Sequence, residues 1–352
     1  MKNLLLGTAA IAGLVLTATP AAAQLELTIG GHSKNYVGYL DQDDADTGVD
    51  MIRETELHFN GESTLDNGLT FGFQVETEVD GTDGGNTIEE SYIYLSSGFG
   101  RLNLGSEDGA AYLLQIAAPS ADSNIDGIRQ YISPFATDRG ALTGLSAVDY
   151  AQDVTGQSEK ITYLSPNYAG FQFGASYTHD VDDSASLANN SVDAANGFNA
   201  NLESGYEAAL RYEGATSGLG YAFGAGYSAV EDDNDGIDAW NVGLDVDAGA
   251  FGIGVVYTDT DGIDDLATAT VDAESDALVV GVDYTTGAVK LGASYLTGEN
   301  TGNDVDRYTG GVVYTAGPGL SFRGSVSHLE ADDAAGEEED ATAVLGGIQI
   351  NF

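Results

Sequence analysis

The feature that most constrains the fold is an alternation of apolar and polar residues with a period of two. In the stretch FQFGASY, Phe171, Phe173, Ala175 and Tyr177 share one face, and polar or small residues occupy the other. Such alternation indicates β-strands with two unlike faces. The connections between these segments are alternately very short, such as TSG at 216–218, and long and rich in aspartate, such as EDDNDG at 231–236.

Short turns at one end and long loops at the other are typical of an up-and-down barrel that crosses a membrane. We therefore predict an all-β fold, a 16-stranded antiparallel transmembrane β-barrel. A soluble β-sandwich or β-helix is the alternative, and alternation alone does not distinguish the two. The predicted strands are 24–40, 51–65, 69–80, 87–97, 101–107, 158–166, 170–180, 204–214, 219–230, 237–247, 251–260, 276–285, 288–298, 305–315, 320–331 and 341–352.

The C-terminal stretch VLGGIQINF fits such a barrel. Ile348, Ile350 and Phe352 share one phase, which we assign to the lipid. A bilayer tolerates no unpaired strand edge, so we expect the last strand to pair with the first and close the sheet. The even number of strands is expected to place both termini of the chain on the side of the short turns.

The first residues have the features of a secretory signal. Residues 1–23 combine Lys2, an apolar run over 4–16, and the small residues Ala21 and Ala23. A membrane anchor is the weaker interpretation, because the apolar run is too short to span a bilayer. We expect a cleaved signal peptide over 1–23, a single barrel domain over 24–352, and export. The chain has no cysteine, so no disulfide framework is expected.

The charge is strongly negative. Asp and Glu number 56 against 11 Lys and Arg, which gives a formal net charge of −45. Nucleic acid is therefore excluded as a partner. Most of the few bases lie within predicted strands, in the phase opposite the apolar one, which we assign to the lumen: Lys34, Arg101, Lys160, Arg211, Lys290, Arg307 and Arg323.

The aromatic residues favour a membrane barrel over a sandwich. Rings on the apolar phase are expected in two belts, one at each membrane interface. Phe171, Phe251 and Phe322 follow short turns. The other belt is predicted to contain Tyr177, Tyr227, Tyr257, Tyr284 and Tyr295.

Residues 108–157 form the longest and most apolar connection. Long apolar loops are uncommon on a surface. We expect this third external loop to fold into the lumen and narrow it, with its acids facing the channel. The alternative is that these acids only cap turns. The candidate constriction acids are Glu107, Asp108, Asp122, Asp126, Asp138, Asp149 and Asp153.

No enzyme or dedicated metal motif is found. EDDNDGIDAWNV resembles a calcium loop, but its twelfth position is Val242 rather than Glu. The four histidines, His32, His58, His179 and His328, are scattered without ligand spacing. We expect no catalytic residue and no cofactor, with only loose binding of divalent cations such as calcium by the loop acids.

Several stretches resemble the general diffusion porins of Gram-negative outer membranes, of the alphaproteobacterial type. They are FNGESTLDNGLTFGFQVETE at 59–78, SYIYLSSGFGRLNLG at 91–105, ITYLSPNYAGFQFGASY at 161–177 and the terminal Phe352. Two features depart from that pattern. Ser106 stands where such porins often carry a base, and the third loop lacks the Pro-Glu-Phe-Gly motif.

The resemblance implies a homotrimer of sixteen-stranded barrels in the outer membrane, in contact with lipid and lipopolysaccharide. It implies passive diffusion of ions and small hydrophilic solutes, and loop acids that lie across the pore from wall-borne bases. It also implies that Phe352 is an assembly signal for the barrel-assembly machinery. Because acids outnumber bases in the predicted lumen, we expect cation selectivity. The alternatives are a substrate-specific porin, for sugars or phosphate, and a barrel without conductance.

Overall fold

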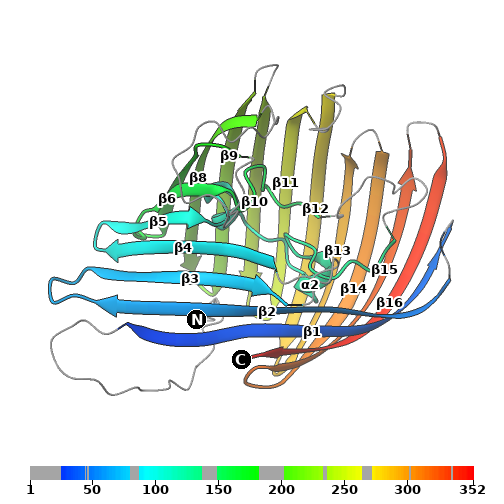
Figure 1. Ribbon diagram of the computed structural model, residues 1–352. Coiled ribbons are helices and arrows are strands. Elements are labelled where there is room, and N and C mark those ends of the chain that lie inside the picture. Colours follow the sequence, from blue (N-terminus) through cyan, green and yellow to red (C-terminus); the bar gives the residue numbers. More distant parts are fainter. Residues whose placement is uncertain are drawn as a thin grey trace.

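Sixteen antiparallel strands form one closed barrel (Figure 1), in which each strand pairs with its neighbours in the sequence and β1 pairs with β16. The computed structural model describes residues 25–43, 45, 47–79, 87–136, 149–181, 202–232, 236–263, 272–300, 303–333 and 336–352. The predicted signal peptide and Asp138 lie outside the described residues. The predicted fold class is confirmed.

The strand bounds follow the sequence prediction closely, with differences of up to four residues at the loop ends. Two short helices, α1 (Ala110–Leu113) and α2 (Ser123–Asp126), lie in the long connection between β5 and β6. The strands are β1 Glu26–Gln42, β2 Gly48–Thr64, β3 Thr70–Glu78, β4 Thr87–Ser97, β5 Gly100–Ser106, β6 Glu159–Leu164, β7 Phe171–Thr178, β8 Leu202–Thr216, β9 Leu219–Asp232, β10 Ile237–Ala248, β11 Phe251–Ile263, β12 Asp272–Thr286, β13 Val289–Asn300, β14 Asn303–Gly317, β15 Leu320–Asp332 and β16 Glu338–Asn351.

The barrel closes through the end of the chain, as predicted. Gly31 and Phe352 exchange two backbone hydrogen bonds, of 3.0 and 3.1 Å. The Asn351 amide donates to the Gly319 carbonyl at 2.8 Å, which places this end beside the short turn between β14 and β15. The Phe352 ring is exposed on the phase of Ile348 and Ile350. Its role as an assembly signal stays a prediction.

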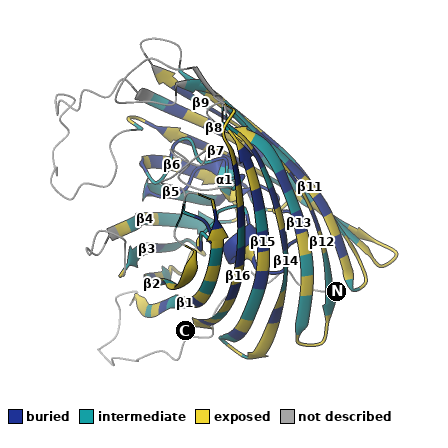
Figure 2. Ribbon diagram, turned by 90° about the vertical axis from the view of Figure 1, so that its right-hand side faces the viewer, coloured by how far each residue is buried: buried dark blue, intermediate teal, exposed yellow. Residues whose placement is uncertain are grey.

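Exposure alternates along the strands, as Figure 2 shows for β11 to β16. In β11, for example, Phe251, Ile253 and Val255 are exposed, whereas Val256 is buried. An apolar outer face of this kind suits a hydrocarbon environment. Among the described residues, no helix has the length and apolar character needed to cross a membrane.

One aromatic assignment is wrong. Tyr284 pairs in register with Phe251, and their ring centroids are 4.7 Å apart. Because β12 runs from a long loop towards a short turn, its C-terminal residues lie at the short-turn end. Tyr284 therefore belongs to the belt of Phe251. At the loop end, Tyr177 packs against Tyr206 at 5.3 Å and Tyr257 packs against Trp240 at 5.1 Å.

Candidate channel constriction

The connection between β5 and β6 packs closely against the inner phase of the wall, where several strands carry glycine. A Cβ atom at Gly281 would lie 1.9 Å from the Pro119 carbonyl oxygen, and one at Gly292 would lie 2.4 Å from the Ala121 amide nitrogen. Only residues without side chains permit this approach of two backbones. Ile116 of the connection is fully buried, and its side chain packs against Gly224 and Gly243 of the wall.

Glu207 of β8 holds both ends of this connection. Its carboxylate accepts a hydrogen bond from the Ala111 amide at 2.8 Å and one from the Thr155 hydroxyl at 2.6 Å. Ala110 adds a bond to the Ser176 hydroxyl of β7 at 2.8 Å. Residues more than forty positions apart in sequence are thus fixed to one side chain of the wall.

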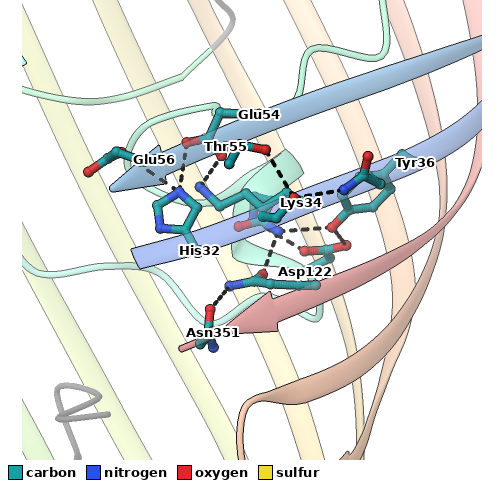
Figure 3. Close-up of polar contacts among 12 residues, drawn as sticks. His32, Lys34, Tyr36, Glu54, Thr55, Glu56, Asp122 and Asn351 are labelled. Carbon is teal, nitrogen blue, oxygen red and sulfur yellow. Dashed lines mark hydrogen bonds and ion pairs between the residues drawn. The ribbon is translucent and has the colours of Figure 1, made fainter. Parts of the chain in front are cut away.

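Asp122 fixes the middle of the connection to the opposite wall, near the seam between β1 and β16 (Figure 3). Its carboxylate accepts a hydrogen bond from the Tyr36 hydroxyl at 2.7 Å, and it pairs with the Arg323 guanidinium at 2.5 Å. It also caps α2 by accepting from the Asn124 amide at 3.2 Å. The Asn124 side chain donates to Gln349 of β16 at 2.9 Å.

This geometry differs from the arrangement that the resemblance implied. Asp122 does not lie across the pore from Arg323, because the two side chains are in direct contact. The Asp122 side chain is fully shielded from solvent. The pair therefore acts as an attachment between loop and wall, and it removes one acid and one base from the predicted transverse arrangement.

A second group of charges centres on Arg129, which the sequence did not assign to the lumen. Its guanidinium pairs with Asp108 at 3.0 Å and also with Asp153. It lies over the Tyr112 ring, 4.5 Å from the centroid. Burial raises the pKa of Asp153 to about 7. Asp108 and Asp153, two of the predicted constriction acids, are thus held together by their ion pairs with Arg129.

A third group contains Asp126, Asp149 and Arg307. Asp126 accepts a hydrogen bond from the Ser294 hydroxyl at 2.7 Å, and Asp149 accepts one from the Gln130 amide at 2.9 Å. Burial raises the pKa of both carboxyl groups, and the Arg307 charge partly opposes that effect. The Arg307 side chain is fully buried beneath the connection.

The remaining predicted bases lie on the inner phase, and three of them contact acids of the wall. Lys34 pairs with Glu54 at 2.6 Å (Figure 3), Arg211 with Glu213 at 2.7 Å and Lys290 with Asp283 at 3.3 Å. Two others find different partners. Lys160 donates to the carbonyls of Glu107 and Gly156, and Arg101 lies over the Tyr94 ring at 3.9 Å.

Sequence reasoning missed two sets of inward residues. The first set consists of tyrosines: Tyr36 shares the inner phase of Lys34 on β1, and Tyr92 and Tyr94 share that of Glu90 on β4. Each lies an even number of residues from the charged residue of its strand, so the alternation in the sequence already indicated its inward position. The description of the histidines as scattered is wrong for His32 and His58, because their rings lie 5.9 Å apart on β1 and β2. Finding that pair required the register between the two strands.

Glu107, just beyond the end of β5, gives a pH prediction. It is buried, and one carboxylate oxygen accepts from the Asn103 amide at 2.7 Å. Burial raises its pKa from 4.5 to about 7, so the folded state prefers the protonated form. The folded state then loses stability as pH rises from about 4.5 through about 7.

We expect Glu107→Gln to remove this loss. The melting temperature of the variant should exceed that of the wild type at pH 8 and match it at pH 4, as followed by circular dichroism. Glu299→Gln, at an exposed position, is the matched control. Equal melting temperatures of Glu107→Gln and wild type at pH 8 would contradict the expectation.

The chain is similar to known outer-membrane porins. The family described as Gram-negative porin matches residues 7–334. The outer membrane porin protein 32 of Delftia acidovorans is 29% identical over 180 residues, which are 48% of this chain and 49% of that protein. The major outer membrane protein P.IB of Neisseria meningitidis is 30% identical over 198 residues, 48% of this chain and 60% of that protein. These alignments thus span about half the length of the relatives.

A solved structure, titled an anion-selective porin from Comamonas acidovorans, superposes with a TM-score of 0.64 at 18% identity. It covers 94% of this chain and 100% of its own. At this identity the likeness concerns the fold. The family match extends over nearly all of the chain, and it agrees with the closed sixteen-stranded barrel. The chain belongs to the Gram-negative porin family.

Proposed function

We propose that the protein is a channel of the Gram-negative outer membrane for passive diffusion of ions and small hydrophilic solutes. It is a porin rather than an enzyme. The observation that carries the proposal is a closed barrel with an apolar outer face whose inner phase is lined by charged and polar side chains. A lumen of this kind suits water and dissolved ions.

We further propose that the channel prefers cations. Several wall bases are already paired with acids of the wall, as in Lys34–Glu54 and Lys290–Asp283. Further acids remain on the inner phase, among them Glu56 and Asp245. A lumen with an excess of carboxylates concentrates cations and repels anions.

The relative from Comamonas acidovorans is named for the opposite preference. A likeness at 18% identity supports a shared fold, but it does not indicate that the same side chains line the two pores. Selectivity depends on those side chains. The acidic excess of this chain, with a net charge of −45, favours cations.

Reversal potentials across a potassium chloride gradient in planar bilayers test this preference. We expect cation preference at low salt and neutral pH. It should decline as salt rises, because the Debye length falls from about 30 Å at 0.01 M to about 3 Å at 1 M. Anion preference at low salt would show that the wall bases control the narrowest point.

A substrate-specific porin is the alternative function. Inward tyrosines offer the rings that a sugar channel requires, but those described are already engaged. Tyr36 binds Asp122, Arg101 lies over Tyr94, and the Lys34 ammonium lies 3.7 Å from the centroid of the Tyr131 ring. These contacts favour a general channel.

We also propose the assembly that the family suggests. The barrel forms a homotrimer in contact with lipid and lipopolysaccharide, and the barrel-assembly machinery inserts it through recognition of Phe352. The constriction comprises the predicted acids Glu107, Asp108, Asp122, Asp126, Asp149 and Asp153 on the connection, together with Asp138. The loop acids bind divalent cations such as calcium loosely, and no cofactor is required.

A further inference from the structure

Two histidines and a glutamate converge on the inner phase of β1 and β2. The register places His32 directly opposite Glu56, and His58 follows Glu56 two residues later on the same face. In Figure 3, His32 of β1 lies beside Glu54 and Glu56 of β2. The same face carries Lys34 and Tyr36, which contact the connection that crosses the barrel.

The spacing of these side chains suits a single metal ion. One ligand atom from each of His32, Glu56 and His58 lies within 4.8 Å of the others. Glu56 Oε2 is 3.7 Å from His32 Nε2, and Glu56 Oε1 is 2.5 Å from His58 Nε2. Bonds of about 2.0–2.1 Å in a tetrahedron separate ligand atoms by about 3.3–3.4 Å. Small side-chain rotations therefore suffice to enclose an ion.

The surroundings of His58 support it as a metal ligand. His58 Nδ1 faces Glu76 Oε1 of β3 at 3.5 Å, which leaves Nε2 directed towards Glu56. A carboxylate behind the second ring nitrogen is the usual way in which proteins orient a metal-binding histidine. The Nε2 atom is also shielded from solvent, and its contact with Glu56 lacks the alignment of a hydrogen bond among the described residues.

The charge balance leaves Glu56 available to an ion. Glu54 already pairs with Lys34 at 2.6 Å and with His32 at 2.7 Å. Glu56 has no lysine or arginine partner among the described residues, and its side chain is only 7% exposed. Glu54 and Glu56 together carry more negative charge than Lys34 balances, and a divalent cation would offset this excess.

We propose that His32, Glu56 and His58 form a binding site in the lumen for a borderline transition-metal ion, with Zn²⁺ as the best match. Zn²⁺ is bound by two histidines and one carboxylate with an open fourth position in many proteins. Calcium and magnesium prefer oxygen ligands throughout and should bind poorly here. Glu76 is a positioning residue that orients His58.

A bound ion would add two positive charges to the inner wall beside the connection. If the proposed channel function holds, Zn²⁺ should reduce cation conductance, and a chelator should restore it. The binding itself does not depend on that function. A direct measurement of binding therefore separates failure of the site from failure of the channel proposal.

The test titrates Co²⁺, as a spectroscopic probe, into the refolded full-length barrel. Zn²⁺ is then added to displace the bound Co²⁺. We expect saturable visible absorption of four-coordinate Co²⁺ at one ion per chain in the wild type. His32→Ala and His58→Ala should abolish it, and Glu76→Gln should weaken Zn²⁺ affinity by about 10- to 100-fold. His179→Ala, an exposed histidine beyond β7, is the matched control and should bind as the wild type does.

A second measurement needs no variant. Zn²⁺ should protect His32 and His58, but not the exposed His179, from diethyl pyrocarbonate, as read by peptide mass spectrometry. Absence of saturable Co²⁺ binding by the wild type would overturn the proposal. Binding that persists in His32→Ala and His58→Ala barrels with normal heat-modifiable migration, or equal labelling with and without Zn²⁺, would also overturn it.

Discussion

Replacing Asp122 with alanine is expected to detach the middle of the long connection from the barrel wall. The change removes the acceptor of the Tyr36 hydroxyl, the partner of Arg323 and the cap of α2 in one step. Breaking one side of a buried ion pair typically costs about 3–5 kcal/mol, because the remaining charge stays buried without compensation. The free energy of unfolding should fall by an amount of that order.

The same variant should change conduction. A connection released from Tyr36 and Arg323 would constrict the lumen less, so single-channel conductance should rise and its noise should increase. Glu62→Ala is the matched control, because Glu62 also accepts from a tyrosine, Tyr94 at 2.6 Å, but is exposed and does not contact the connection. It should cost less than about 1 kcal/mol. Equal behaviour of the two variants would show that Asp122 does not anchor the connection.

Most features of the barrel could be predicted from residue patterns within single strands. The alternation of residues such as Phe171, Phe173 and Tyr177 identifies an outer face without any knowledge of neighbouring strands. The alternation of turn lengths gives the order of pairing, since consecutive antiparallel strands joined by short turns are neighbours. The misplaced Tyr284 shows the limit of this approach, because its height in the membrane depends on the direction of β12.

The site was less predictable because its contacts join distant segments. Asp122 meets Tyr36 and Arg323 across separations of 86 and 201 residues. Sequence composition indicated that acids and bases share the lumen, but it did not indicate which of them touch. His32 and His58 were likewise unrelated until the register of β1 and β2 placed them on one face.

The largest effect on the outer face is expected from Leu244→Arg. Leu244 of β10 is 43% exposed and pairs in register with Phe223 and Val255, both on the apolar outer phase. An arginine on the lipid face costs about 2–4 kcal/mol at the bilayer midplane and less near the interfaces. Equilibrium refolding into vesicles in a urea titration measures this cost.

Asp245→Arg, one residue further on, is the matched comparison. Asp245 lies on the inner phase, where its carboxylate neighbours Gly254 and where Asp283 and Lys290 form an ion pair. The same new side chain should therefore meet water rather than lipid. It should leave the free energy of refolding nearly unchanged and shift the reversal potential towards anions, because an acid becomes a base. If both variants lost the same refolding free energy, the assignment of the two faces of β10 would be wrong.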